Sequence, residues 1–118
     1  MITGTVNVAG APVVLLTVAG QTWPAVVDTG FNGDLELPDS LRPFVNARFK
    51  AYTVSVLAAG QSILEEAYTV DFPFDGETVE AEATFVAGGE ILLGTHLLRE
   101  YHLDVNFPAR TVLLERVP

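Results

Sequence analysis

Short runs of β-branched and aromatic residues recur along this chain, and turn-forming residues separate them about every eight to twelve positions. Val, Ile, Thr, Phe and Tyr suit a pleated strand, whereas Gly, Pro, Asn and Asp end one, so the pattern predicts an all-β fold. Ala19-Gly20 and Asp75-Gly76 predict tight hairpin turns, because such turns need positive φ. We expect strands at residues 2–8, 13–18, 23–27, 35–37, 49–57, 62–74, 77–87, 103–107 and 111–116, with a further turn at 106–109.

Two segments depart from the β pattern. Residues 38–45 predict a short helical turn, with Asp39 or Ser40 as its cap. Residues 95–101 predict a short helix, because the apolar residues of this segment fall on one helical face. Thr95 can cap this helix.

The composition sets limits on the domain organisation and on the partners. The chain has 118 residues, of which 49% are hydrophobic, which predicts a single domain over 1–118 with apolar surface left over for a partner. There is no cysteine, no apolar run as long as a membrane span and no signal-peptide pattern, so we expect a cytoplasmic protein. The net charge of -9 would repel a nucleic-acid backbone, although it allows a basic protein partner.

We expect neither a metal nor a cofactor. His96 and His102 have no third ligand at the spacing of a metal site, so both are interpreted as surface or structural residues. The chain also has no glycine-rich loop of the kind that binds phosphate.

One candidate for chemistry is the point where the apolar run Ala25-Val26-Val27 meets Asp28-Thr29-Gly30. Asp and Gly are poor strand residues, so the strand should end there, with Asp28 at its carboxyl end. Gly30 allows close backbone approach and offers an unhindered N–H, while Thr29 adds a hydroxyl. A plain surface turn is the alternative, since this tripeptide occurs by chance in roughly one chain in fifty of this length.

A second apolar run, residues 91–93, leads into Gly94 in the same way but carries no acid. The two glycines lie 94 − 30 = 64 residues apart. Taken alone, this second element fits an ordinary connection between a strand and a helix. The two elements together resemble one device that is used twice.

The pair VVDTG (26–30) and ILLG (91–94), followed by Leu97-Leu98, resembles the retropepsin-like aspartic peptidases over about residues 2 to 117. The resemblance implies a closed, barrel-like sheet with two crossed ψ-shaped loops and one short helix near residues 95–101. It implies that Asp28 is catalytic, that Thr29 bonds across a two-fold axis and that the Gly30 N–H points at the carboxylate of its own subunit.

The resemblance also implies a flap, a β-hairpin that covers the substrate. The candidate is residues 54–64, with a tip at Ala58, Ala59, Gly60 and Gln61. Small residues at a tip suit mobility and close contact with a peptide backbone. A plain hairpin turn is the alternative, because the tip has only one glycine.

Three positions differ from the viral members. Phe31 replaces the small residue usual after the triad, and Asn32 and Thr95 replace the Asp and Arg that form an ion pair there. That ion pair cannot form here, and Phe31-Asn32-Gly33 resembles the bacterial branch of the family instead.

Aspartic peptidases need two carboxylates that share a proton, and this chain has one Asp-Thr-Gly. The expected function is therefore an aspartic endopeptidase that acts as a homodimer on a peptide or protein substrate. The resemblance also implies that the terminal segments 1–6 and 112–117, which a monomer would leave as unpaired edge strands, join the dimer. Two alternatives stay open: a catalytically silent dimer that binds peptide or protein, and a small acidic protein that neutralises a basic partner.

Overall fold

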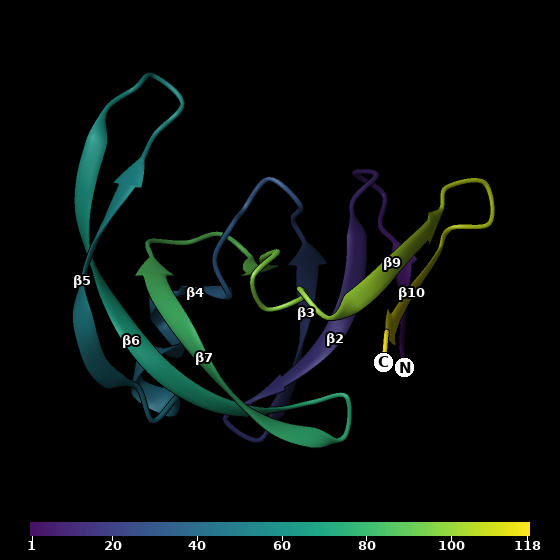
Figure 1. The fold of residues 1–118 in the computed structure, drawn as a ribbon, viewed down its shortest axis with the longest axis horizontal. Coiled ribbons are helices and arrows are strands. Elements are labelled where there is room, and N and C mark those ends of the chain that lie inside the picture. The colour runs from purple at the N-terminus through teal and green to yellow at the C-terminus, as the bar shows by residue number, and fades with distance from the viewer.

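The computed structural model describes residues 1–118 as ten strands in one sheet and one 3-10 helix (Figure 1). No helix in it is long and apolar enough to cross a membrane. Hydrogen-bonded neighbours follow the order β5-β6-β7-β4-β8-β3-β2-β1-β10-β9. The elements are β1 (Ile2–Val6), β2 (Pro12–Val18), β3 (Gln21–Val27), β4 (Leu35–Pro38), η1 (Asp39–Phe44), β5 (Arg48–Val56), β6 (Ser62–Phe74), β7 (Glu77–Val86), β8 (Ile91–Leu93), β9 (Tyr101–Asn106) and β10 (Thr111–Arg116).

The predicted strands are confirmed, with ends that differ by up to two residues. Both predicted tight turns are confirmed as well, since Ala19 and Gly20 have φ of 53° and 76°, and Asp75 and Gly76 have φ of 52° and 82°. In the turn of residues 107–110, the Asn106 side chain accepts the Ala109 N–H at 3.0 Å.

The predicted helix at 95–101 is wrong. Within this segment the Leu98 N–H donates to the carbonyl four residues earlier, as in an α-helix. The N–H groups of Arg99 and Tyr101 donate to carbonyls only three residues earlier, as in turns. The chain already enters β9 at Tyr101, which pairs with Arg116, so the six residues before it form turns. The regular helical segment is η1, where the predicted caps are also wrong, because Pro38 precedes the helix and no side chain caps it.

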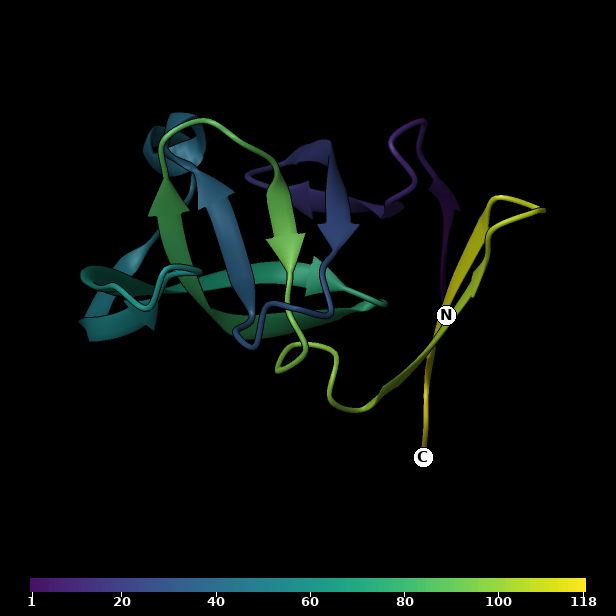
Figure 2. The same ribbon diagram turned by 90° about the horizontal axis from the view of Figure 1, so that it is seen from above.

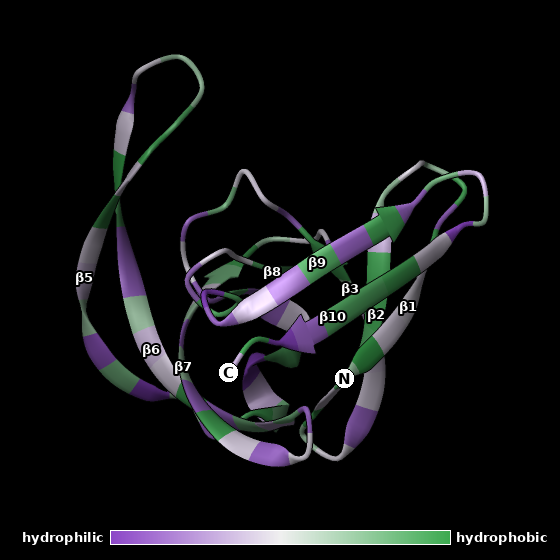
Figure 3. Cartoon of the chain, turned by 45° about the vertical axis from the view of Figure 1, so that its right-hand side comes forward, coloured by the Kyte–Doolittle hydropathy of each residue, from purple (hydrophilic) through white to green (hydrophobic).

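A cluster of 19 buried hydrophobic residues forms the core. Strand β2 shows the alternation behind it, because Val14, Leu16 and Val18 are buried while Leu15 between them is 69% exposed. Figure 3 shows the hydrophobic stretches on β2 and β10. Leu35, Leu37, Leu93 and Leu114 are among the largest fully buried side chains, so the core includes β8, which pairs with β3, and β4, which pairs with β8.

The terminal strands lie inside the sheet, so the prediction that they are unpaired edges is wrong. Strand β1 pairs with β2 on one side and β10 on the other, and β10 pairs with both β1 and β9. Figure 2 shows the N-terminus beside the β9–β10 hairpin. The two ends of the strand order are β5 and β9, and no pairing joins them, so closure into a barrel stays a prediction.

Candidate active site

Two loops meet at the end of β8. Strand β8 lies between β3, to which it is parallel, and β4, to which it is antiparallel, so the loop of residues 28–34 must cross the end of β8. Its two ends are bonded to that strand end: the Asp28 N–H donates to the Leu93 carbonyl at 3.0 Å, and the Gly94 N–H donates to the Asp34 carbonyl at 3.0 Å. We call residues 28–34 the Asp28 loop and residues 94–100 the Gly94 loop.

The structure brings the three predicted triad residues together at the end of β3. Asp28 is half-buried, and the Gly30 N–H donates to its Oδ1 at 2.9 Å. Thr29 and Gly30 are exposed. No ion pair within the chain involves Asp28, so its carboxylate is available to a group from outside.

Phe31, which distinguishes this chain from the viral pattern, packs over the crossing of the two loops. A Cβ on Gly33 would lie 2.8 Å from the Phe31 ring, and a Cβ on Gly94 would lie 2.8 Å from it and collide with the Gly33 carbonyl. The two glycines therefore allow the ring and both backbones to approach closely. The Thr95 N–H completes the contact by donating to the Phe31 carbonyl at 2.8 Å.

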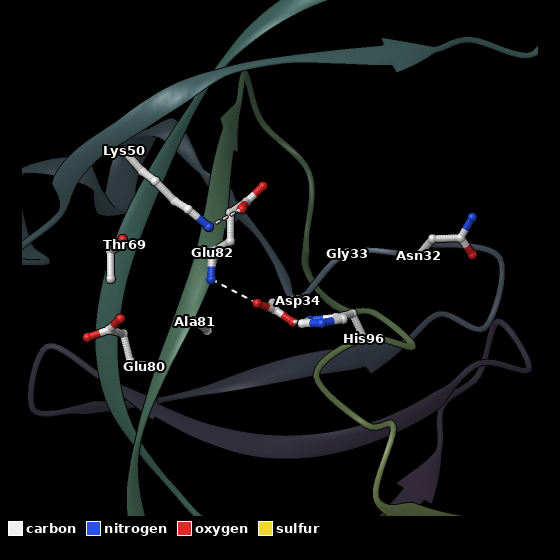
Figure 4. Close-up of a pocket in the computed structure, with 9 residues that line it drawn as sticks. All are labelled: Asn32, Gly33, Asp34, Lys50, Thr69, Glu80, Ala81, Glu82 and His96. Carbon is white, nitrogen blue, oxygen red and sulfur yellow. Dashed lines mark hydrogen bonds and ion pairs between the residues drawn. The ribbon is translucent and has the colours of Figure 1, made fainter.

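Sequence reasoning missed one polar pair at this crossing, Asp34 and His96 (Figure 4). His96 Nδ1 lies 2.5 Å from Asp34 Oδ1, and Asp34 Oδ2 accepts the Glu82 N–H of β7 at 2.9 Å. Asp34 is the one buried charged residue of the chain. The sequence could have indicated this pair only through the positions of its residues. Asp34 directly precedes the buried strand β4, and His96 follows Gly94 by two residues.

The β5–β6 hairpin extends from the body of the molecule, as the flap prediction requires (Figure 1). A groove of about 510 Å³ lies between this hairpin and the Asp28 loop. Its walls come from the hairpin strands rather than from the predicted tip, since Ala58, Ala59 and Gly60 are exposed and do not line it. The lining residues are Gly30, Phe31, Asn32, Gly33, Asp34, Leu35, Glu36, Thr53, Val54, Ser55, Val56, Leu57, Glu65, Glu82 and Thr84.

The groove is acidic. Burial raises the pKa of the Glu36 carboxyl, and the neighbouring Glu65 and Asp28 carboxylates raise it further. Glu65 accepts a hydrogen bond from the Ser55 hydroxyl at 2.9 Å, across the hairpin. No group of three or more His, Asp or Glu side chains is placed to hold a metal ion.

Comparison with known proteins rests on structure alone, since no family model and no curated protein matches the chain by sequence. The chain is similar to a retropepsin-like aspartic protease from Rickettsia conorii, with a TM-score of 0.69 and 18% identity over 96% of this chain and 88% of that one. The chain has a retropepsin-like fold.

Viral structures share this retropepsin-like fold. The simian foamy virus protease matches with a TM-score of 0.58 and 20% identity, over 74% of this chain and 91% of that one. The foamy viral protease-reverse transcriptase matches with a TM-score of 0.59 and 18% identity, over 78% of this chain but only 12% of that one. The overall fold is thus similar although no more than 20% of the residues are identical in these three comparisons.

Proposed function

We propose that the chain is an aspartic endopeptidase that acts as a homodimer, with Asp28 as the one catalytic carboxylate of each subunit. The observation that carries the proposal is the Asp28 site itself, at the end of β3 in a retropepsin-like fold. Its carboxylate accepts the Gly30 N–H and has no cationic partner within the chain. The Asp-Thr-Gly sequence and the groove beside it support the same function.

The reaction needs a second Asp28. Two close carboxylates hold one proton between them, so one of them is ionised and can accept a proton while the other is protonated and can donate one. The ionised carboxylate takes a proton from water, whose oxygen attacks the scissile carbonyl carbon, while the protonated carboxyl donates to the carbonyl oxygen. The tetrahedral intermediate then collapses, and the amine leaves with a proton from the dyad.

A symmetric dimer supplies that second carboxylate. Exposed Thr29 and Gly30 lie next to Asp28, where a second copy must approach for the two carboxylates to meet. Thr29 would then bond across the two-fold axis to fix both loops. Strands β1 and β10 already have partners on both sides within the chain, which favours the face that bears Asp28 as the proposed contact.

The β5–β6 hairpin would act as the flap that covers a bound peptide. Thr53 and Ser55 of β5 and Glu65 of β6 line the groove beneath the hairpin, whereas Leu64 does not. A peptide under the hairpin would displace water from these side chains and from the groove. The tip residues Ala58, Ala59 and Gly60 would contact the peptide only when the hairpin closes.

Hydrolysis of a peptide library by the purified protein tests the proposal, with wild type compared with Asp28→Asn. An Asn side chain can still accept the Gly30 N–H, so the variant should fold and dimerise but lose hydrolysis. Asp39→Asn, at an exposed site on η1, is the matched control and should keep full activity. Wild-type turnover by purified Asp28→Asn would disprove the mechanism, and binding without cleavage by the wild type would indicate a silent peptide-binding dimer.

A further inference from the structure

We infer that Asp34 and His96 are positioning residues, which hold the Asp28 loop in the shape that its catalytic carboxylate needs. The inference rests on the proposed peptidase function. Neither residue touches the reacting atoms in this role. Each acts through the loop whose first residue is Asp28 and whose last is Asp34.

The pair joins the two crossed loops through side chains. The carboxylate of Asp34 only accepts hydrogen bonds, so His96 Nδ1 carries the proton and donates across the 2.5 Å contact. Beside it, the His96 N–H donates to the Gly33 carbonyl at 3.2 Å, so both the backbone and the side chain of His96 hold the end of the Asp28 loop. Figure 4 shows the imidazole lying against the Asp34 carboxylate.

The same carboxylate also connects the loops to the flap side of the molecule. Asp34 Oδ2 accepts the Glu82 N–H, and the Glu82 side chain pairs with Lys50 of β5 at 2.8 Å. The Lys50–Glu82 pair is exposed and contributes little by itself, because solvent screens it. Asp34 is buried, so its two hydrogen bonds fix its position much more strongly.

Removal of His96 would leave one oxygen of a buried carboxylate without its partner. Such a group turns toward water or another donor, and the loop would shift with it because Asp34 is the last residue of the Asp28 loop. A displacement of the loop would reach Asp28 through the intervening turn, in which the Phe31 N–H donates to the Asp28 carbonyl at 3.1 Å. Catalysis is sensitive to shifts of this kind, since a misplacement of about 1 Å can cost about 100-fold in rate.

The experiment compares peptide hydrolysis and amide hydrogen exchange in the full-length wild-type protein, His96→Ala and His96→Asn. We expect His96→Ala to lower kcat by about 10- to 100-fold with little change in KM. His96→Asn keeps a hydrogen-bond donor at the same δ position and should recover much of that loss. His102→Ala, at an exposed site on β9, is the matched control and should leave kcat unchanged.

Hydrogen exchange supplies a measurement that does not depend on activity. We expect His96→Ala to speed exchange of the Asp28 and Gly30 amides about tenfold, while exchange at Val14 in the core of β2 stays unchanged. Unchanged kcat in His96→Ala would overturn the inference, even if the melting temperature fell. If the wild-type protein cleaves no peptide, faster exchange at Asp28 would still support the positioning role, whereas unchanged exchange would refute it.

Discussion

The Gly30 N–H donates to Oδ1 of Asp28 at 2.9 Å, so the residue two positions along the chain orients the carboxylate. A Cβ at Gly30 would lie 3.3 Å from that oxygen, which is shorter than an ordinary van der Waals contact. The carboxylate therefore takes its direction from the backbone of its own loop. Whatever fixes the shape of the loop, such as Gly94, Phe31 or the Asp34–His96 pair, also fixes the direction of Asp28.

Gly94→Ala should destabilise the fold by about 3 kcal/mol or more, because the new Cβ would collide with the Gly33 carbonyl oxygen, so the backbone of one loop must shift. The control is Gly10→Ala, where a Cβ meets nothing within 4 Å and only the positive φ of 84° opposes it, at about 1–2 kcal/mol. Urea unfolding of both variants measures the difference. Equal destabilisation would show that the crossing is looser than the structure indicates.

Leu114→Ala should lower the free energy of unfolding by about 2–5 kcal/mol, because Leu114 of β10 is fully buried and the deletion leaves a cavity. Leu15→Ala makes the same chemical change at an exposed site on β2 and should alter stability by less than about 0.5 kcal/mol. Denaturant titration of the two variants side by side provides the comparison. Similar values for both would place β10 outside the core.

Deletion of residues 113–118 should unfold the protein rather than release a folded monomer. The deletion removes most of β10, which lies between β1 and β9 and supplies Leu114 to the core. Far-UV circular dichroism and sedimentation distinguish the two outcomes. A folded, monomeric product would show that the terminal strands serve the dimer instead of the sheet of one subunit.

Glu36→Gln should stabilise the protein at pH 7 but not in acid. The pKa of Glu36 is raised above 4.5, chiefly by burial, so the folded chain binds this proton more tightly than the unfolded chain. The stabilisation from that proton is fully present below the pKa that Glu36 has in the unfolded chain. It is lost as pH rises through the raised pKa that Glu36 has in the folded chain. The variant, which is never charged, should therefore melt higher than wild type at neutral pH, and the gap should close below about pH 4.

Glu115→Gln, at an exposed site on β10, is the control and should give the same small change in Tm at both pH values. A Glu36→Gln advantage that persists unchanged in acid would mean that packing, rather than charge, causes it.

The strand pattern and the Asp28 turn could be predicted because both depend on local chemistry. β-branched runs form strands wherever they occur, and Asp28-Thr29-Gly30 must end one. Resemblance to a family supplied the rest of the expected site. The Gly30 hydrogen bond to Asp28, expected from that resemblance, is present in the structure.

The errors concern features that tertiary contacts decide. The helix at 95–101 had suitable residues, but the pairing of Tyr101 with Arg116 draws that end of the segment into a strand. The terminal strands were sufficiently apolar for an interface, yet the sheet of one subunit uses them. His96 was interpreted as a surface or structural residue, which the structure does not contradict, but its partner Asp34, 62 residues away, was not identified.

Mixing wild-type subunits with Asp28→Asn subunits tests the central claim most directly, because it asks whether each active site needs one Asp28 from both chains. At equal amounts and constant total protein, only the dimers with two wild-type chains can work. Activity after subunit exchange should then fall to about one quarter of the pure wild-type value. A fall to about one half would contradict the account, since each subunit would then catalyse hydrolysis without its partner's Asp28.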